Sequence, residues 1–203
     1  MFITRTRSIL ALAAIAAVSL TGCGDADTGH TTEHGTSTTA SAVTSAPARA
    51  EYDDADVMFL QMMYPHHAQA VEMARLVPSH TDNPQLRTLA TQIEQAQAPE
   101  MQQITSLLQS FGKPAPTANE GHGGHGMPGM MSAEQMTALQ AASGTDFDRQ
   151  WLTMMIEHHA GAITMSETEL AEGRNADAKA LAETIIAAQR TEIEQMRTML
   201  GQR

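Results

Sequence analysis

The sequence contains one motif twice, at a constant spacing of ninety-two residues. Residues 59–73 read Phe-Leu-Gln-Met-Met-Tyr-Pro-His-His-Ala-Gln-Ala-Val-Glu-Met, and residues 151–165 share the pattern Met-Met-x-x-His-His-Ala-x-Ala-x-x-Met in register. The same spacing pairs Asp56 with Asp148, Asn83 with Asn175, Gln97 with Gln189 and Glu100 with Glu192. A spacing kept over about fifty residues indicates an internal duplication, so the fold must be built from two similar units.

The first 22 residues predict a lipoprotein signal peptide. Arg5 and Arg7 precede an apolar run over 9–20, which is too short to span a membrane comfortably. Leu20-Thr-Gly-Cys23 resembles the lipobox of bacterial lipoproteins, in which the cysteine receives a lipid. Cys23 is the only cysteine, so the chain has no internal disulfide. We expect an exported protein anchored by lipid to the outer face of the bacterial cell membrane; an ordinary secretory signal is the alternative.

Composition divides the remaining chain into a tether, 23–52, and one domain, 53–203. The tether is rich in Thr, Ser, Ala and Gly and has too few large apolar residues to offset the entropy of ordering. Removing residues 1–22 takes two of the twelve Lys and Arg residues and no acid, so the charge becomes 10 − 23 = −13 with His neutral. That charge disfavours nucleic acid as a partner and attracts cations.

Apolar residues in the domain recur with helical periodicity, and no segment predicts a strand. The sequence therefore predicts an all-α four-helix bundle made of two duplicated hairpins. The first repeat is 53–111, a Gly/His/Met linker is 112–131 and the second repeat is 132–203. Long helices are expected from Asp53 to Pro78, over 84–111, from Asp146 or Asp148 to Glu172 and over 176–200, with a short extra helix near 132–141. Pro65 is expected to kink the first helix.

Polar residues on the apolar faces of these helices are the candidates for chemistry. A buried carboxylate needs a partner, so Glu100 and Glu192 are expected to contact a histidine on the neighbouring helix. Thioether and imidazole groups together suit Cu(I), and Ag(I) by the same chemistry. The candidate metal ligands are His66, His67, His158, His159, Met62, Met63, Met73, Met154, Met155 and Met165.

The linker carries a second set of the same ligand types among glycines. These residues, expected to capture metal weakly and exchangeably, are His122, His125, Met127, Met130 and Met131. Because glycines are costly to order, we expect no rigid cage there. A Gly/Ser replacement of 121–131 is expected to leave the fold intact.

These elements resemble the bacterial family known as domain of unknown function 305. The resemblance rests on Phe59-Leu-x-x-Met-x-x-His66-His67, its copy from Trp151, and Gln97-x-x-Glu100 with Gln189-x-x-Glu192. It implies a ferritin-like four-helix fold in exported proteins, an association of some members with copper or silver through Met and His, and no enzymatic activity. The sequence departs from the usual motif at Tyr64-Pro65, where the second copy has Ile156-Glu157.

Three functions follow as hypotheses. The first is a lipid-anchored protein that binds or buffers Cu(I), in which Gln97, Glu100, Gln189, Glu192, Asp56 and Asp148 orient the histidines or serve as alternative ligands. The second is a di-iron oxidase; it is disfavoured because Met63 and Met155 occupy the positions where Glu-x-x-His would need glutamate. The third is a structural or interaction protein of the cell envelope, in which Met fills the core and His–Glu pairs set helix register.

Overall fold

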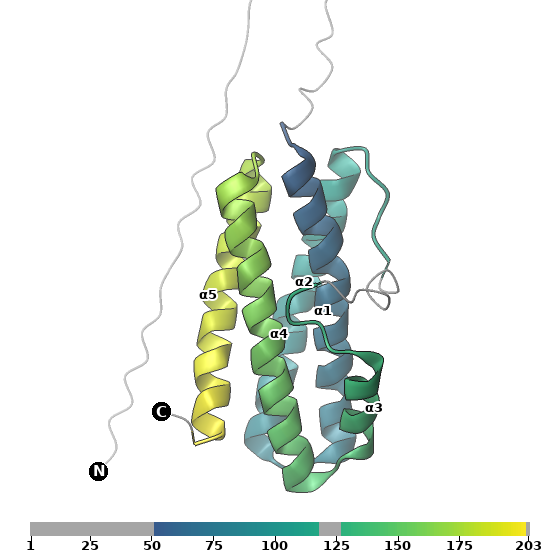
Figure 1. Cartoon of the computed structure of the whole chain (residues 1–203), viewed down its shortest axis with the longest axis vertical. Coiled ribbons are helices and arrows are strands. Elements are labelled where there is room, and N and C mark those ends of the chain that lie inside the picture. Colours follow the sequence, from purple (N-terminus) through teal and green to yellow (C-terminus); the bar gives the residue numbers. More distant parts are fainter. Residues whose placement is uncertain (1–50, 118–126, 202–203) are drawn as a thin grey trace, which may run out of the picture. The chain divides into compact units, whose positions relative to one another are not determined.

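The computed structural model describes residues 51–117 and 127–201, and this part of the chain contains helices, turns and loops but no strand. Figure 1 shows the long helices side by side, with the short helix α3 (Ala133–Ala141) against their flank. The prediction of an all-α chain is confirmed. The helices are α1 (Asp54–His80), α2 (Pro84–Ser110), α3 (Ala133–Ala141), α4 (Gly144–Glu172) and α5 (Ala176–Met199). No helix in the described ranges is long and apolar enough to cross a membrane.

Helix ends follow the capping residues of the sequence. Asp53 caps α1 and forms a capping box with Asp56, while Asn83 and Asn175 cap α2 and α5 at equivalent positions of the two repeats. Ser132 and Gln135 form the capping box of α3. These four helices therefore start where a side-chain oxygen accepts the free N–H groups of the first turn, whereas α4 has no side-chain cap.

Two helix boundaries differ from the predictions. The first helix, which runs through Pro65 as expected, continues two residues past Pro78 to His80, and the Thr81 N–H still bonds to the Val77 carbonyl. The third long helix begins at Gly144, earlier than Asp146 or Asp148. Gly144 has φ +58°, a left-handed conformation that lets the chain turn directly from α3 into α4.

Aspartates of each repeat hold the interhelix turn of the other repeat. Asp56 Oδ1 accepts hydrogen bonds from the Arg174 N–H at 3.0 Å and the Asn175 N–H at 2.8 Å. In the opposite direction, Asn83 Nδ2 donates to Asp148 Oδ2 at 2.9 Å. This position corrects the expectation that Asp56 and Asp148 orient histidines. Both share a helix face with the histidines but lie about 15 Å along it, ten residues at about 1.5 Å each.

The core consists of two apolar clusters with the histidines between them. Along α1, Met63 belongs to one cluster and Ala70 to the other; along α4, Met155 and Ala162 are divided in the opposite sense. The cluster containing Ala70 also takes in α3 and the start of α4 through Met136, Leu139, Phe147 and Trp151. The histidine pairs thus lie at mid-height of the two central helices, where neither apolar cluster reaches.

Residues 127–131, here called the strap, lie across α1 and α4. The Gln69 side chain binds the strap backbone twice, donating to the Met131 carbonyl at 2.9 Å and accepting from the Met131 N–H at 2.8 Å. On α4, a Cβ added to Gly161 would collide with the Pro128 carbonyl and lie 2.7 Å from the Gly129 Cα. Gln69 and Gly161 occupy equivalent positions of the duplication and differ because each accommodates the strap.

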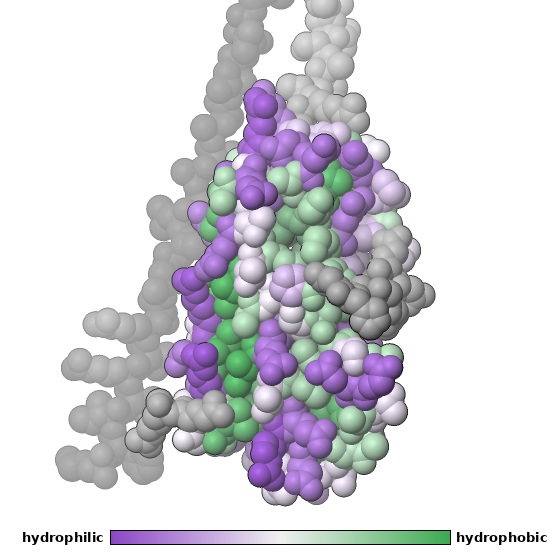
Figure 2. Space-filling view, viewed as in Figure 1, coloured by the Kyte–Doolittle hydropathy of each residue, from purple (hydrophilic) through white to green (hydrophobic). Residues whose placement is uncertain are grey.

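The strap corrects the expectation that the whole linker is a replaceable spacer. Met131 is buried, and Gly129 has φ +76°, a conformation that suits glycine. A Gly/Ser replacement of 121–131 would remove the Met131 side chain from the core. Figure 2 shows the face that carries the strap, where hydrophobic strips run between hydrophilic residues along the helices.

We predict that Gly161→Ala destabilises the protein by about 1–3 kcal/mol, because the added methyl group displaces the strap backbone. Alanine in a helix is otherwise better than glycine by about 1 kcal/mol, so the sign of the change is diagnostic. Urea denaturation measures it. The control is Ala160→Gly at the exposed neighbouring position, which should cost only the helix-propensity difference. A Gly161→Ala variant more stable than the parent would contradict the packing described.

Candidate metal centre

Four histidines meet where α1 crosses α4. His66, His67, His158 and His159 all have no exposed surface. The rings of His66 and His158 face each other across the helix interface, with centroids 3.8 Å apart and planes inclined by 38°. Both members of each His-His pair therefore lie inside, although adjacent residues of a helix point about 100° apart.

One histidine of each pair is bonded to a glutamate on the neighbouring helix of its own hairpin. His67 Nε2 lies 2.7 Å from Glu100 Oε2 on α2, and His159 Nε2 lies 2.6 Å from Glu192 Oε2 on α5. The glutamate side chains are 12 and 14 % exposed. Because a carboxylate accepts the Nε2 proton, each ring in its neutral form presents the Nδ1 lone pair on its other side. Metal-bound histidines are commonly oriented in this way.

The centre has buried polar atoms that no protein group satisfies. Within the described residues, Nδ1 of His66, His67 and His159 and both ring nitrogens of His158 lack a hydrogen-bond partner. His66 Nε2 donates to the Pro128 carbonyl of the strap at 3.0 Å. The amide groups of Gln97 and Gln189, one turn before the glutamates, are also buried without a partner. Such groups typically cost about 1–3 kcal/mol each, so a ligand that bonds to them would be favoured.

Burial keeps two of these rings neutral. Desolvation, with a contribution from His67, lowers the pKa of His66 to about 3 against the opposing bond to Pro128. Burial also lowers the pKa of His158 well below its usual value, reinforced by the neighbouring His66, His159 and His67 and opposed only by the backbone of His66. Since a metal binds the unprotonated imidazole, binding at these two rings requires no proton release at neutral pH.

The arrangement limits which metals it suits. In the described ranges, no three or more His, Cys, Asp or Glu groups are placed to hold a metal ion together. Glu100 and Glu192 are each bonded to a histidine of their own hairpin, so the two carboxylates belong to different hairpins. A carboxylate-rich di-iron centre, which needs Glu from several helices around one site, is therefore not assembled here. Nitrogen and sulfur donors in small number suit a soft ion better.

The structure divides the predicted methionine ligands into two environments. Met63 and Met155 are fully buried one turn before His67 and His159, and Met73 and Met154 pack in the cluster with α3. Met165, which also packs in the apolar cluster of Met63, and the partly buried Met62 line a pocket together with Met58. Met58 was not among the predicted ligands. Its signal was the i,i+4 spacing between Met58 and Met62 on α1.

The predicted linker residues are only partly placed. His122 and His125 lie outside the described residues. Met127 and Met130 are half-buried in the strap, and Met131 packs in the apolar cluster. Pro128, which the sequence did not single out, contacts a histidine through its carbonyl; no side-chain pattern could have indicated it.

A second buried polar site joins the start of α1 to the end of α4. Burial and the adjacent Asp56 carboxylate raise the pKa of Glu169 to about 8. For Asp56, burial raises the pKa, but the N–H groups of Asp53, Asn175 and Arg174 outweigh that effect, so the net pKa is lowered. Neither oxygen of Glu169 has another hydrogen-bond partner. At neutral pH the pair therefore holds one proton, which belongs to Glu169, and one negative charge.

Known proteins are similar to this chain in fold and in sequence. The family model described as Domain of unknown function (DUF305) matches residues 56–200. A candidate secreted DUF305 protein from Streptomyces coelicolor is 32 % identical with a TM-score of 0.66, over 72 % of this chain and 92 % of that one. A DUF305 fragment from Deinococcus radiodurans is 32 % identical with a TM-score of 0.65, over 73 % and 97 %. CopM in its Cu(I)-bound form is 30 % identical with a TM-score of 0.59, over 71 % and 94 %. No curated protein matches the chain.

We predict that Glu192→Ala destabilises the fold by about 1–3 kcal/mol, because it leaves His159 Nε2 buried without a partner. Urea denaturation of the metal-free protein measures the change. Glu194→Ala is the matched control on the same helix: Glu194 pairs with Arg197 at the surface, and such pairs contribute about 0–1 kcal/mol. Equal effects of the two substitutions would show that the His159–Glu192 bond does not stabilise the fold.

We predict that the melting temperature falls as pH rises from about 7 to 8, because below about pH 7 the lowered pKa values of His66 and His158 act in the opposite direction and make the fold more stable as pH rises. Glu169 has a higher pKa in the fold, about 8, than its ordinary 4.5, so the folded state binds the proton more tightly than the unfolded state. Its contribution is complete below pH 4.5 and is lost as pH rises to 8. Glu169→Gln, which imitates the protonated acid, should flatten this slope, whereas Glu172→Gln at an exposed position should not. An unchanged slope in Glu169→Gln would refute the assignment.

Proposed function

Because the chain belongs to the DUF305 family, we propose that it is an exported protein that binds Cu(I), and Ag(I) by the same chemistry, at its buried histidines. CopM, a relative of similar fold, is recorded in Cu(I)-, Cu(II)- and Ag-bound forms. The observation that carries the proposal is the set of buried ring nitrogens without partners where α1 meets α4. The closely facing rings of His66 and His158 are central to it.

The proposed site takes nitrogen from the histidines and sulfur from the methionines beside them. Met63 and Met155 precede His67 and His159 by one helical turn and share their faces. Glu100 and Glu192 hold the two outer rings by their Nε2 atoms, which leaves Nδ1 for the metal. A monovalent soft ion needs few ligands and little charge compensation, and the absence of a preassembled carboxylate cluster in the described residues agrees with such an ion.

The proposal extends to the architecture and the cell envelope. The four long helices form a ferritin-like bundle, supported by the pairing of α1 with α2 and of α4 with α5 into duplicated hairpins. Residues 1–22 act as a lipoprotein signal, Cys23 carries the lipid and 23–52 form the tether; of these residues, 1–50 lie outside the described part of the chain. The candidate secreted relative from Streptomyces coelicolor supports export.

A structural role for the polar core is the competing function, favoured by the same two His–Glu bonds. A hydrogen-bonded pair in each hairpin would fix helix register without any metal. A purely structural role explains the two His–Glu bonds but does not explain why the ring nitrogens of His158 are buried without a hydrogen-bond partner.

We predict that the chain lacking residues 1–22 binds Cu(I) in competition with a chromogenic chelator, and that His158→Ala/His159→Ala weakens the tightest binding at least tenfold. The reason is loss of the ring nitrogens at the interface. His80→Ala is the control, since His80 bonds to the backbone of Leu76 and Gln140 away from the centre. Circular dichroism verifies that both variants fold. Unchanged affinity in the double variant, or no Cu(I) binding by the parent, would leave only the structural role.

A further inference from the structure

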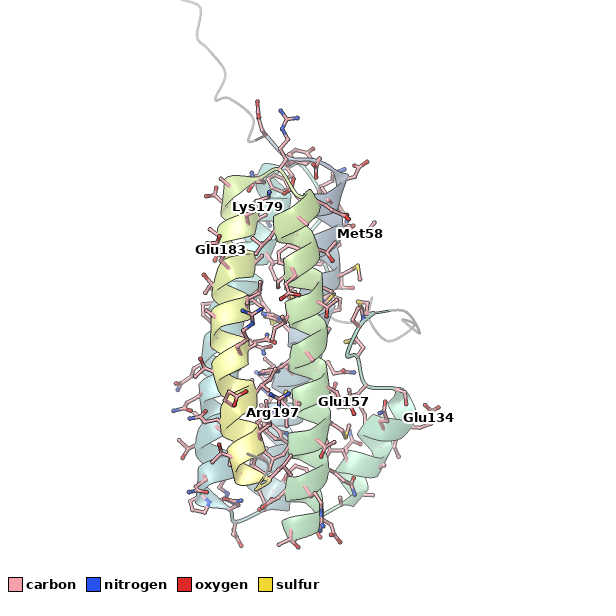
Figure 3. The ribbon with its side chains drawn as sticks, turned by 60° about the vertical axis from the view of Figure 1, so that its left-hand side comes forward. Met58, Glu134, Glu157, Lys179, Glu183 and Arg197 are labelled. Atoms are coloured by element: carbon pink, nitrogen blue, oxygen red, sulfur yellow. The ribbon has the colours of Figure 1, made fainter. Side chains whose placement is uncertain are left out.

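A pocket of about 200 Å³ lies between the first turns of α1, the last turns of α4 and the strap. Three thioether side chains line it: Met58 and Met62, one turn apart on α1, and Met165 on α4. Met58 is 60 % exposed and is the only large apolar side chain exposed in the described ranges. Figure 3 shows it on the outer side of α1, away from α5 and the labelled Lys179 and Glu183. Packing does not explain a methionine in this position.

The duplication supplies an internal comparison. The positions equivalent to Met62 and Met165 are Met154 and Met73, so both copies have this pair of thioethers. In the second location the pair is closed over: both belong to the cluster that includes Met136 and Leu139 of α3, and the Trp151 indole donates to the Met73 carbonyl at 2.9 Å. There both methionines are core residues, whereas in the first location Met165 is buried and Met62 is only partly buried.

The open copy differs from the closed one in two further residues. Met58 stands where the second repeat has Gln150, and Glu169 stands where the first repeat has Val77. The pocket therefore gains a third sulfur and a buried carboxyl group that the closed copy lacks. Buried charge requires compensation, and the Asp56–Glu169 pair supplies one negative charge beside the pocket.

We propose that this pocket is a second cation site, in which the sulfur atoms of Met58, Met62 and Met165 bind a soft monovalent ion, Ag(I) or Cu(I). Three thioethers select such an ion over hard cations. Met58 closes the site by turning inward, which its flexible, unbranched side chain allows. The pocket shares no proposed ligand with the histidine centre, so the two proposals can be tested separately.

The position of the strap connects the two sites. Pro128 lines the pocket with the three methionines, and its carbonyl accepts the hydrogen bond from His66. An ion in the pocket is thus separated from the histidines by one residue of backbone. Because Met58 is exposed, an ion there exchanges with solvent more readily than one at the buried histidines.

Nuclear magnetic resonance of methionine methyl groups tests the proposal. The chain lacking residues 1–22, labelled with ¹³C at the methionine methyl groups, is titrated with silver nitrate, a redox-inert probe. We expect the signals of Met58, Met62 and Met165 to shift together and to stop shifting once one silver ion per chain is bound at the pocket. The signals of Met73 and Met154 should not shift. Absence of shifts at the first three, or equal shifts at all five, would overturn the proposal.

Leucine substitutions provide matched variants, because leucine keeps the volume and removes the sulfur. Met58→Leu should weaken silver binding at the pocket at least tenfold, and Met62→Leu/Met165→Leu should abolish it, whereas Met73→Leu/Met154→Leu should leave it unchanged. His158→Ala/His159→Ala separates the sites: pocket shifts that persist there show a site distinct from the histidines. Pocket shifts lost there show that the methionines belong to the histidine centre, which would refute a second site.

Discussion

The register of the helices depends on a polar layer that cannot slide. His67 with Glu100 and His159 with Glu192 fix α1 against α2 and α4 against α5, and the facing rings of His66 and His158 fix one hairpin against the other. A shift of one turn would bury these groups against apolar side chains without partners, which costs far more than a displaced methyl group. The apolar clusters above and below supply most of the burial, but their Leu, Ile and Met side chains could pack in several registers. The polar layer at mid-height selects one of these registers.

Features that depend on local sequence were predictable. The offset of ninety-two residues indicated two hairpins, and the core position of Glu100 and Glu192 required histidine partners on the adjacent helices. Contacts between the two hairpins were not predictable in this way. Asp56 and Asp148 share a helix face with the histidines but lie near the start of their helices, where they bind the turn of the other hairpin. Helical phase and rise give the direction and height of a side chain, and its partner depends on how the hairpins pack.

The position of the strap could not be predicted from the sequence pattern. The composition of the whole segment 112–131, rich in glycine and proline, indicates a linker, and the helix residues that contact the strap become clear only in three dimensions. One signal was present in the repeated motif: the first copy has Gln69 where the second has Gly161. The methionines follow the same logic, since Met62 and Met154 are indistinguishable in sequence and are separated by what α3 covers. Departures from the repeat are therefore more informative about function than the repeat itself.

The crossed aspartates also bear on how such a chain could have arisen. Asp56 binds the turn at Asn175, and Asp148 binds the turn at Asn83. Each hairpin therefore provides an aspartate for the turn of the other hairpin. This exchange has the form of an isologous interface, in which two identical subunits related by a two-fold axis present the same surface to each other. A single hairpin of this kind would leave its turn and its aspartate unmatched and would be complete only as a homodimer. Gene fusion of such a dimer would free each copy to diverge, and it is after such a fusion that one end could be sealed by α3 while the other stayed open.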